Sequence, residues 1–412
     1  MLRKTVALIV SCFFVLSGLS ACAESSPDTA AGSSLSESKT EEPADNKSDR
    51  NNLMAEEPHE IPEELLRSGE MRGLSPEEIV ADMKTGWNLG NTLDATGGTG
   101  RSSEISWGNP RTKKEMIDAV HDRGFDTVRI PVTWAGHLGD GPEYTIDPEW
   151  LDRVQEVVNY AIDDEMYVIL DTHHEESWRI PNDANIDAVD EQHAAIWAQI
   201  AERFKDYGDK LIFEGMNEPR VKGSPDEWNG GTPAERKNID RLNQTFIDTV
   251  RNTGGNNSER LLLLATYGNS CVPDAIESAV IPDDPNIAFS LHAYTPYAFT
   301  YNVNESWELF DWDGSHDDDI KYQFSDIKSK FLDNGIPVIL TEYGAVNKDG
   351  HDEDVIRWLG VYLGYAKELG MPCIWWDNGV YTGDGERFGL FDRHKLSWFS
   401  DEKVDAIMEV YK

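Results

Sequence analysis

Short apolar runs alternate with longer amphipathic stretches from about residue 80 to the C-terminus. Short apolar runs predict buried strands, and longer stretches with a one-sided apolar pattern predict helices. The predicted strands are Thr85–Gly90, Asp126–Val132, Tyr167–Thr172, Leu211–Met216, Arg260–Thr266, Ile287–His292, Pro337–Thr341 and Pro372–Trp376. The predicted helices include Lys113–Arg123, Pro148–Glu165, Asp190–Tyr207, Pro233–Asn252, a short one near Pro273–Val280, Asp317–Asn334, Glu353–Leu369 and Asp401–Tyr411.

This alternation is typical of repeated strand–helix units. Strands that are apolar throughout suit a parallel sheet whose outer face is covered by helices. Eight such units in about 350 residues fit a single (β/α)8 TIM barrel with extended βα loops. The structural alternative is an open, doubly wound α/β sheet, but the glycine-rich run at residues 97–100 lacks the strand–turn–helix setting of a phosphate-binding loop.

Polar and aromatic side chains gather where the predicted strands end, while the interiors of the runs are apolar. In TIM-barrel enzymes the active site lies at the carboxyl ends of the strands. Six of the eight strands end in this way and a seventh carries Arg129, so the pattern predicts a functional site on one rim. The residues concerned are Asn91, Arg129, His173, His174, Asn217, Glu218, His292, Tyr294, Glu342 and Trp376.

The most informative pair on this rim is Glu218, after the fourth strand, and Glu342, after the seventh. Two carboxylates that face each other across a cleft suit glycoside hydrolysis: one protonates the leaving oxygen and the other attacks the sugar carbon, at a separation of about 5–5.5 Å in retaining enzymes. The alternative is that each is a structural carboxylate paired with an arginine. The polar residues around the pair favour the catalytic interpretation.

The neighbours of the two glutamates suggest supporting roles. Arg129 near Glu342 would lower the pKa of that carboxyl, and the hydroxyl of Tyr294 would donate to the same group. His292 near Glu218 would influence its proton cycle. Asn217 would bind a sugar 2-hydroxyl.

Trp376 offers an aromatic plane for the C–H face of a sugar ring.

The adjacent residues His173 and His174 could be ligands of a metal ion, because zinc takes three or four converging ligands. Adjacent residues on a strand point to opposite faces, so we expect one ring in the cleft and the other packed elsewhere. With no HExxH motif either, we expect no catalytic metal.

The N-terminal residues carry targeting signals. Residues 1–21 combine Arg3 and Lys4 with an apolar run too short to span a bilayer, which predicts a signal peptide. The run ends in Leu19-Ser20-Ala21-Cys22, which resembles the bacterial lipobox and implies lipidation of Cys22; an ordinary signal peptide with an incidental cysteine is the alternative. Residues 22–60, acidic and rich in Ser and Pro, predict a disordered tether. Residues 61–412 then form the catalytic domain, held at the surface of a bacterial membrane by the lipid alone.

The net charge and the cysteines of the chain limit the kinds of partner and cross-link that are expected. The formal net charge of -39 repels polyanions, so nucleic acid is excluded as a partner, whereas a neutral polymer is unaffected. Beyond the N-terminal segment, Cys271 and Cys373 lie in or beside apolar runs and are expected to be buried thiols, with a disulfide as the alternative. We expect the protein to act as a monomer.

The motifs together resemble glycoside hydrolase family 5, the cellulase family, over about residues 80 to 400. They are Gly86-Trp87-Asn88-Leu89-Gly90-Asn91, Val128-Arg129-Ile130-Pro131, His173-His174-Glu175, Asn217-Glu218-Pro219, His292-Ala293-Tyr294, Thr341-Glu342-Tyr343-Gly344 and Trp375-Trp376-Asp377-Asn378. The resemblance implies Glu218 as acid/base, Glu342 as nucleophile, a retaining mechanism without a cofactor, and β-1,4-glucans as substrates. It also implies substrate-binding roles for Asn91, Arg129, His173, His174, Asn217, His292, Tyr294 and Trp376.

Further segments, such as Trp107-Gly108-Asn109-Pro110 and Tyr294-Thr295-Pro296-Tyr297, resemble the broad-specificity endoglucanases that also act on xyloglucan, mixed-linkage glucan or xylan. Thr341 departs from the pattern, because many relatives have glycine before the nucleophile. The alternatives are a mannanase or xylanase on the same scaffold, and a non-catalytic glycan-binding surface lipoprotein.

Overall fold

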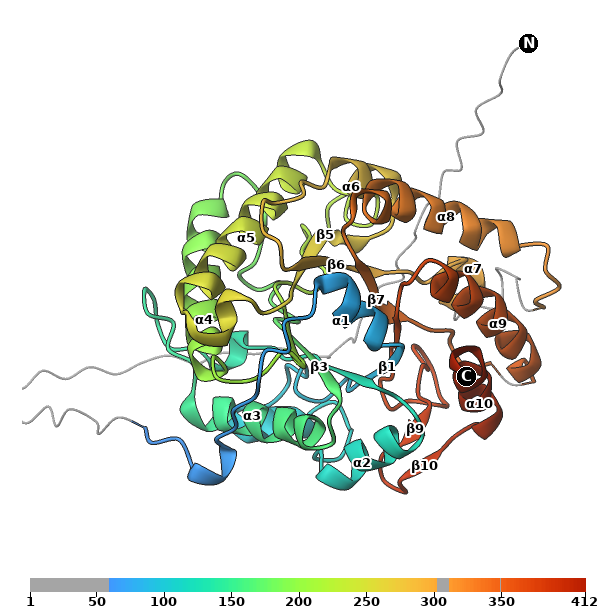
Figure 1. The fold of residues 1–412 in the computed structure, drawn as a ribbon, viewed down its shortest axis with the longest axis horizontal. Helices are drawn as coiled ribbons and strands as arrows, with labels where there is room; N and C mark the ends of the chain where they lie inside the picture. Colours follow the sequence, from blue (N-terminus) through green and yellow to red (C-terminus); the bar gives the residue numbers. More distant parts are fainter. Residues whose placement is uncertain (1–58, 302–310, 349) are drawn as a thin grey trace, which may run out of the picture. The chain divides into compact units, whose positions relative to one another are not determined.

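The computed structural model describes residues 59–301, 311–348 and 350–412. Eight parallel strands close into a barrel in chain order, as predicted (Figure 1). The open, doubly wound sheet is excluded because the last barrel strand pairs with the first, with Thr85 opposite Cys373. The strands are β1 (Thr85–Asn88), β2 (Thr127–Ile130), β3 (Tyr167–Asp171), β4 (Leu211–Glu214), β5 (Leu262–Ser270), β6 (Ile287–His292), β7 (Val338–Tyr343) and β8 (Cys373–Trp375).

Helices surround the barrel and follow one another around it in chain order (Figure 1). They are α2 (Lys114–Asp122), α3 (Pro148–Asp163), α4 (Ile186–Arg203), α5 (Pro233–Asn252), α6 (Pro273–Ser278), α8 (Asp317–Lys330), α9 (Asp352–Glu368) and α10 (Asp401–Tyr411). Each was predicted, and α5 has the predicted bounds; Thr232 and Glu235 form a capping box that starts this helix at Pro233.

Several short elements were not predicted from the hydrophobic pattern, which is weak over so few residues. They are α1 (Pro76–Asp82), α7 (Tyr297–Thr300), the 3-10 turns η1 (Glu63–Leu65), η2 (Gly100–Ile105), η3 (Ala135–His137), η4 (Gly255–Ser258) and η5 (Leu332–Asn334), and the two-stranded sheet of β9 (Phe391–Asp392) and β10 (Ser397–Trp398).

One of these, α1, closes the amino-terminal end of the barrel. Ile79, Val80 and Met83 are buried and form one apolar cluster with barrel residues that include Ile169 and Ile212. In Figure 1 the helix lies across the centre of the ring of strands. An apolar plug at this end leaves the carboxyl ends of the strands as the open face, where a site is expected.

The residues before α1 form an amino-terminal strap, residues 59–72, that runs along α3. His59 contacts the carboxylate of Asp152 near the start of that helix at 2.9 Å. Arg67 contacts Asp163 at its end, also at 2.9 Å. Because the strap follows the helix from one end to the other, it is part of the folded domain.

Cys271 and Cys373 are free and buried, as predicted. The thiol of Cys271 donates to the carbonyl of His292 at 3.3 Å. None of the helices in the described part of the chain is long and apolar enough to cross a bilayer. Residues 1–21, Cys22 and nearly all of the predicted tether lie outside the described residues.

Candidate active site

Glu218 lies in the loop after β4 and has a backbone φ of 40°. This left-handed conformation costs a non-glycine residue about 1–3 kcal/mol and tends to occur at functional sites. The N–H of Glu218 donates to Oδ1 of Asn269 at 2.7 Å, and the N–H of Asn217 donates to the carbonyl of Thr172 at 3.0 Å. These bonds hold the loop in the strained conformation that places the Glu218 carboxylate.

Glu342 lies on β7 and is only 6% exposed. Nη1 of Arg129 donates to its Oε1 at 2.9 Å, and the hydroxyl of Tyr294 donates to its Oε2 at 3.0 Å. Each carboxylate oxygen therefore has its own donor, and the orientation of the group is fixed from two sides. Both contacts were predicted from the sequence.

His292 lies between the two glutamates. Its Nδ1 is 3.1 Å from Oε1 of Glu218 and 3.5 Å from Oε2 of Glu342. One side-chain oxygen of each glutamate and the histidine nitrogen all lie within 4.8 Å of one another. The structure thus brings together the two carboxylates that the strand-end pattern paired.

The three groups shift one another's proton affinity. Burial raises the pKa of Glu342 and outweighs the lowering by His292 and Arg129, so the predicted effect of Arg129 is present but is not the larger one. Burial would also raise the pKa of Glu218, but the hydrogen bond from His292 and the charges of His292 and Arg220 lower it to about 2. The two carboxylates in turn raise the pKa of His292 against the effect of its burial. This arrangement favours a proton on His292 in the free protein.

Arg129 is fully buried and contacts two further carboxylates besides that of Glu342. Its Nε donates to Oε2 of Glu214 at 2.6 Å, and its Nη2 lies 2.8 Å from Oδ2 of Asp171. The expectation of apolar strand interiors is therefore wrong at Asp171 and Glu214, two acids inside otherwise apolar runs. That placement was the available signal, because a buried carboxylate is stable only when it is paired.

Thr341, the departure from the family pattern, extends this network. Oε1 of Glu214 accepts a hydrogen bond from Ser290 at 2.6 Å, and the hydroxyls of Ser290 and Thr341 lie 2.5 Å apart. A hydroxyl at position 341 thus links the strand of the predicted nucleophile to the carboxylate of Glu214.

His173 and His174 do not face opposite sides, so that expectation is wrong. The strand β3 ends at Asp171, and beyond it the alternation of side chains no longer holds. The two imidazole centroids are 4.5 Å apart, with ring planes at 84°. His173 is held by Asp171, whose Oδ2 lies 2.8 Å from Nδ1.

Trp376 lies parallel to the ring of His173, with 5.7 Å between the centroids. Gly90 packs so closely that a Cβ atom there would lie 2.8 Å from the indole.

The two predicted asparagines differ in their contacts. Oδ1 of Asn217 accepts a hydrogen bond from Arg129 at 2.8 Å, while its Nδ2 has no hydrogen-bond partner among the described residues. Asn91 donates its N–H to Asp94, and no contact in the described parts of the chain joins its side chain to the glutamates.

Arg220 was not singled out from the sequence. Its Nη1 lies 3.2 Å from Oε2 of Glu218, and its Nε donates to Glu227 at 3.0 Å. The guanidinium also lies 4.5 Å from the ring centre of Trp228, which is half exposed. Its position two residues after Glu218 was the signal that could have identified it.

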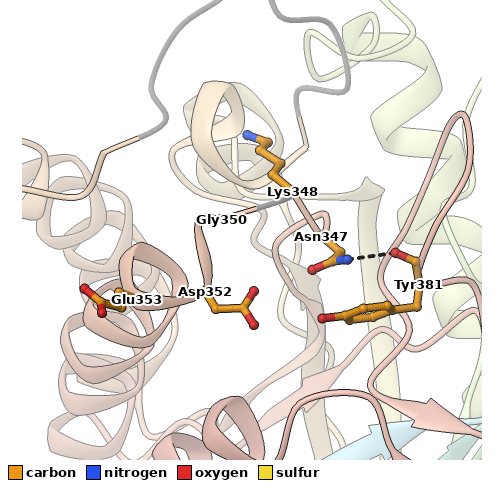
Figure 2. Close-up of a pocket in the computed structure, with 6 residues that line it drawn as sticks. All are labelled: Asn347, Lys348, Gly350, Asp352, Glu353 and Tyr381. Carbon is orange, nitrogen blue, oxygen red and sulfur yellow. Dashed lines mark hydrogen bonds between the residues drawn. The ribbon is translucent and has the colours of Figure 1, made fainter.

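A separate cavity of about 290 Å³ lies beside the start of α9 (Figure 2). It is lined by Asn347, Lys348, Gly350, Asp352, Glu353 and Tyr381. Nδ2 of Asn347 donates to the carbonyl of Tyr381 at 2.8 Å, and in Figure 2 Lys348 points away from Asp352. This cavity contains neither Glu218 nor Glu342 and is distinct from the predicted catalytic pair.

Comparison with known proteins decides the family. The sequence profile of the cellulases of glycosyl hydrolase family 5 matches residues 91–382, which is more than half of the chain. The chain belongs to glycoside hydrolase family 5. This family 5 hydrolase is 62% identical over 347 residues to endoglucanase A of Ruminococcus albus, a match that covers 84% of the chain and 95% of the relative. It is 41% identical over 341 residues to endoglucanase B of Clostridium cellulovorans, covering 82% of the chain and 76% of the relative.

Solved structures of family 5 enzymes share the barrel. A xyloglucan-specific endo-β-1,4-glucanase from a metagenomic library, in complex with cellotriose, is 52% identical with a TM-score of 0.78, and the match covers 80% of this chain and 97% of that one. A broad-specificity endoglucanase from Ruminococcus champanellensis with bound cellotriose is 44% identical with a TM-score of 0.80, covering 82% and 100%. The family 5 hydrolase thus has the (β/α)8 fold of its relatives, and all four of these relatives are endoglucanases.

Proposed function

We propose that the protein is an endo-β-1,4-glucanase that cleaves cellulose-like β-glucans with retention of configuration. Its endoglucanase relatives and its family support this activity on β-glucans. The observation that carries the mechanism is the approach of the two carboxylates to within 4.8 Å. Retaining enzymes separate the two groups by about 5–5.5 Å, whereas inverting enzymes leave about 6.5–9.5 Å for a water molecule.

In the first step, Glu342 attacks the anomeric carbon and Glu218 gives its proton to the leaving oxygen, which forms a covalent glycosyl-enzyme. In the second step, Glu218 takes a proton from water, which attacks the same carbon and releases Glu342. Arg129 and Tyr294 hold Glu342 in position for the attack. His292, in contact with both carboxylates, passes its proton to Glu218 before the first step and takes a proton back from Glu218 after the second.

The rim around the pair binds the sugar. The free Nδ2 of Asn217 donates to the 2-hydroxyl, a contact that strengthens in the transition state. Trp376 offers its indole face to a sugar ring, and His173 lies beside it. Asn91 and His174 complete the proposed set of substrate-binding residues on the loops after β1 and β3.

Xyloglucan and mixed-linkage glucan are proposed as additional substrates. The 52% identical structure is of a xyloglucan-specific enzyme, and a lichenase from Caldicellulosiruptor sp. F32 is 39% identical with a TM-score of 0.78. The sequence segments shared with broad-specificity endoglucanases favour the same range. Mannanase or xylanase activity and non-catalytic glycan binding are the competing possibilities.

The deciding experiment counts the reducing ends released from soluble substituted cellulose, mixed-linkage glucan, xyloglucan, xylan and mannan. The purified protein is expected to act on the first three. Glu342→Gln should lose activity by on the order of 10³-fold or more, since no nucleophile remains. Glu353→Gln, an exposed glutamate in the first turn of α9 outside the predicted catalytic pair, is the matched control and should retain activity.

Release mainly from mannan or xylan would overturn the substrate class and leave the mechanism intact. Activity of Glu342→Gln equal to that of the unchanged protein would refute the assignment of the nucleophile. A folded protein that releases nothing from any polymer would favour the glycan-binding alternative.

We further propose that the protein acts as a monomer and is exported and anchored through a lipid on Cys22. The lipobox-like sequence at residues 19–22 and the acidic tether after it support the anchoring. Expression in a bacterium supplied with a labelled fatty acid should label the protein, and Cys22→Ser should remain unlabelled. Equal labelling of the two would contradict lipidation at this residue.

A further inference from the structure

Three side chains that are good metal ligands converge beside the catalytic pair. They are Asp94, His173 and His174, and one ligand atom of each lies within 4.8 Å of the other two. Nε2 of His174 is 3.8 Å from Oδ2 of Asp94, too far for a hydrogen bond. These groups thus come together without binding one another directly.

A carboxylate lies on the far side of each imidazole, and the one behind His173 is within hydrogen-bond distance. Nδ1 of His173 is held by Asp171, and this leaves Nε2 without a hydrogen-bond partner in the described part of the chain. Nδ1 of His174 lies 3.7 Å from Oε1 of Glu176, and its Nε2 is the nitrogen directed toward Asp94. A carboxylate behind a histidine is the usual arrangement that orients a metal-binding imidazole and strengthens it as a ligand.

The third ligand is held equally firmly. Asp94 is fully buried, and its two oxygens accept hydrogen bonds from the N–H groups of Asn91 at 3.0 Å and Thr92 at 2.6 Å. The side chain of His174, in contrast, is 27% exposed, so solutes can reach the group from outside. A fixed buried carboxylate with two histidines and an open side has the form of a three-ligand metal site.

The types of ligand atom indicate which class of metal ion would bind. Two imidazole nitrogens and one carboxylate oxygen suit zinc and similar transition metals, whereas magnesium and calcium take oxygen ligands. Ligand atoms at about 2.1 Å from a tetrahedral zinc lie about 3.5 Å from one another. The 3.8 Å between His174 and Asp94 is close to this value, so small side-chain rotations suffice.

We propose that Asp94, His173 and His174 bind a divalent transition-metal ion such as zinc, and that the bound ion inhibits hydrolysis. The ion would lie in the plane of the His173 ring, between His173, His174 and Asp94 and beside Trp376, where it would exclude the sugar that the proposed function places against these residues. The hydrolytic steps proposed above are written without a metal. Binding of the ion is independent of the proposed function, whereas inhibition rests on it.

Zinc titrated by calorimetry into the purified protein, without a polyhistidine tag and after chelator treatment, tests the binding. The unchanged protein should bind one zinc ion at this site and no magnesium. His174→Gln and Asp94→Asn should each weaken zinc binding by tenfold or more, and thermal melting should show that both variants are folded. His394→Gln, an exposed histidine elsewhere, is the matched control and should bind as the unchanged protein does.

Two results would overturn the site. One is zinc binding by folded His174→Gln and Asp94→Asn at the strength of the unchanged protein. The other is loss of binding only in His292→Gln, which would place the ion between Glu218 and Glu342.

Inhibition is measured separately on a soluble β-glucan. Zinc should inhibit the unchanged protein, and His174→Gln should need at least tenfold more zinc for the same fractional loss. Equal inhibition of both would refute the inhibitory role. If no polymer is hydrolysed, the proposed function fails while the calorimetry still decides the metal site.

Discussion

Arg129 shows how one residue can organise a site. Its guanidinium contacts three carboxylates, those of Asp171, Glu214 and Glu342, and all of these groups are buried. The planar fork of five N–H donors lets it serve several acceptors in fixed directions, which a lysine ammonium cannot do. The orientation of Glu342 therefore depends on strands β2, β3 and β4 as well as on its own strand.

The role of Arg129 beside Glu342 was predictable from the sequence, because both stand in recognisable strand-end motifs. The contacts to Asp171 and Glu214 were not, because they depend on which strands become neighbours and in what register. Asp171 lies opposite Glu214 in the β3–β4 pairing. A one-dimensional pattern shows an acid in an apolar run but does not show its partner.

Tyr294→Phe tests the support of Glu342 at the level of a single hydrogen bond. The tyrosine hydroxyl favours the charged carboxylate, so its removal should raise the pKa of Glu342 further. Hydrolysis requires ionised Glu342, so the acidic limb of the kcat/KM profile should move upward by about one pH unit. Tyr160→Phe, which loses a hydroxyl bonded to Glu156 on α3, should leave the profile unchanged. An unshifted acidic limb in Tyr294→Phe would mean that this bond does not set the pKa.

At the scale of the elements, the barrel strands and the outer helices were predicted well, because their periodic patterns are long or strongly apolar. The end of β3 was placed one residue too late, and the alternation of a strand was applied to His173 and His174 although both lie beyond its end. The helix α1 was missed although Ser75 and Glu78 form a capping box, because only seven residues follow that signal. Its stability comes from packing on the barrel end, which the local sequence does not show.

The contact between the loop after β1 and the end of β8 permits a second prediction. Gly90→Ala would place a Cβ atom 2.8 Å from the indole of Trp376 and 2.9 Å from the carbonyl of Asp377. The indole must shift, so KM for β-glucan should rise several-fold, and stability should fall by about 1–3 kcal/mol. Gly360→Ala on α9, where no atom obstructs the new methyl group, should instead stabilise the protein by about 0.5–1 kcal/mol. Urea denaturation and initial rates measure both; an unchanged KM in Gly90→Ala would contradict the placement of Trp376 in the sugar site.

At the scale of the whole molecule, two buried histidines make stability depend on pH. Burial lowers the pKa of His137 to about 4 and of His193 to about 3. Below about pH 6.5 the unfolded chain takes up protons that the native histidines do not bind, so the free energy of unfolding falls as the pH falls. At pH 5 the two histidines together should lower the free energy of unfolding by about 4 kcal/mol relative to its value at high pH.

His137→Phe isolates half of this effect. The imidazole stacks on Trp150 at 3.8 Å, and its Nδ1 has no hydrogen-bond partner in the described structure, so a phenyl ring fits the place. Between pH 6.5 and pH 5 this variant should lose about 1.5 kcal/mol less of its free energy of unfolding than the unchanged protein. Urea titrations at the two pH values measure the difference, and His394→Gln should behave as the unchanged protein. Equal losses in all three proteins would mean that His137 is protonated in the native state.

The amino-terminal strap determines which contacts would break first if the protein were pulled by its N-terminus. A pull on the chain ahead of residue 59 would first load the contact between His59 and Asp152, and only later the pair of Arg67 and Asp163. These contacts are spread along α3, so they would peel away one after another and extend the chain while the barrel stays closed. In the proposed lipid-anchored protein, the strap would thus lengthen under load before the barrel opens.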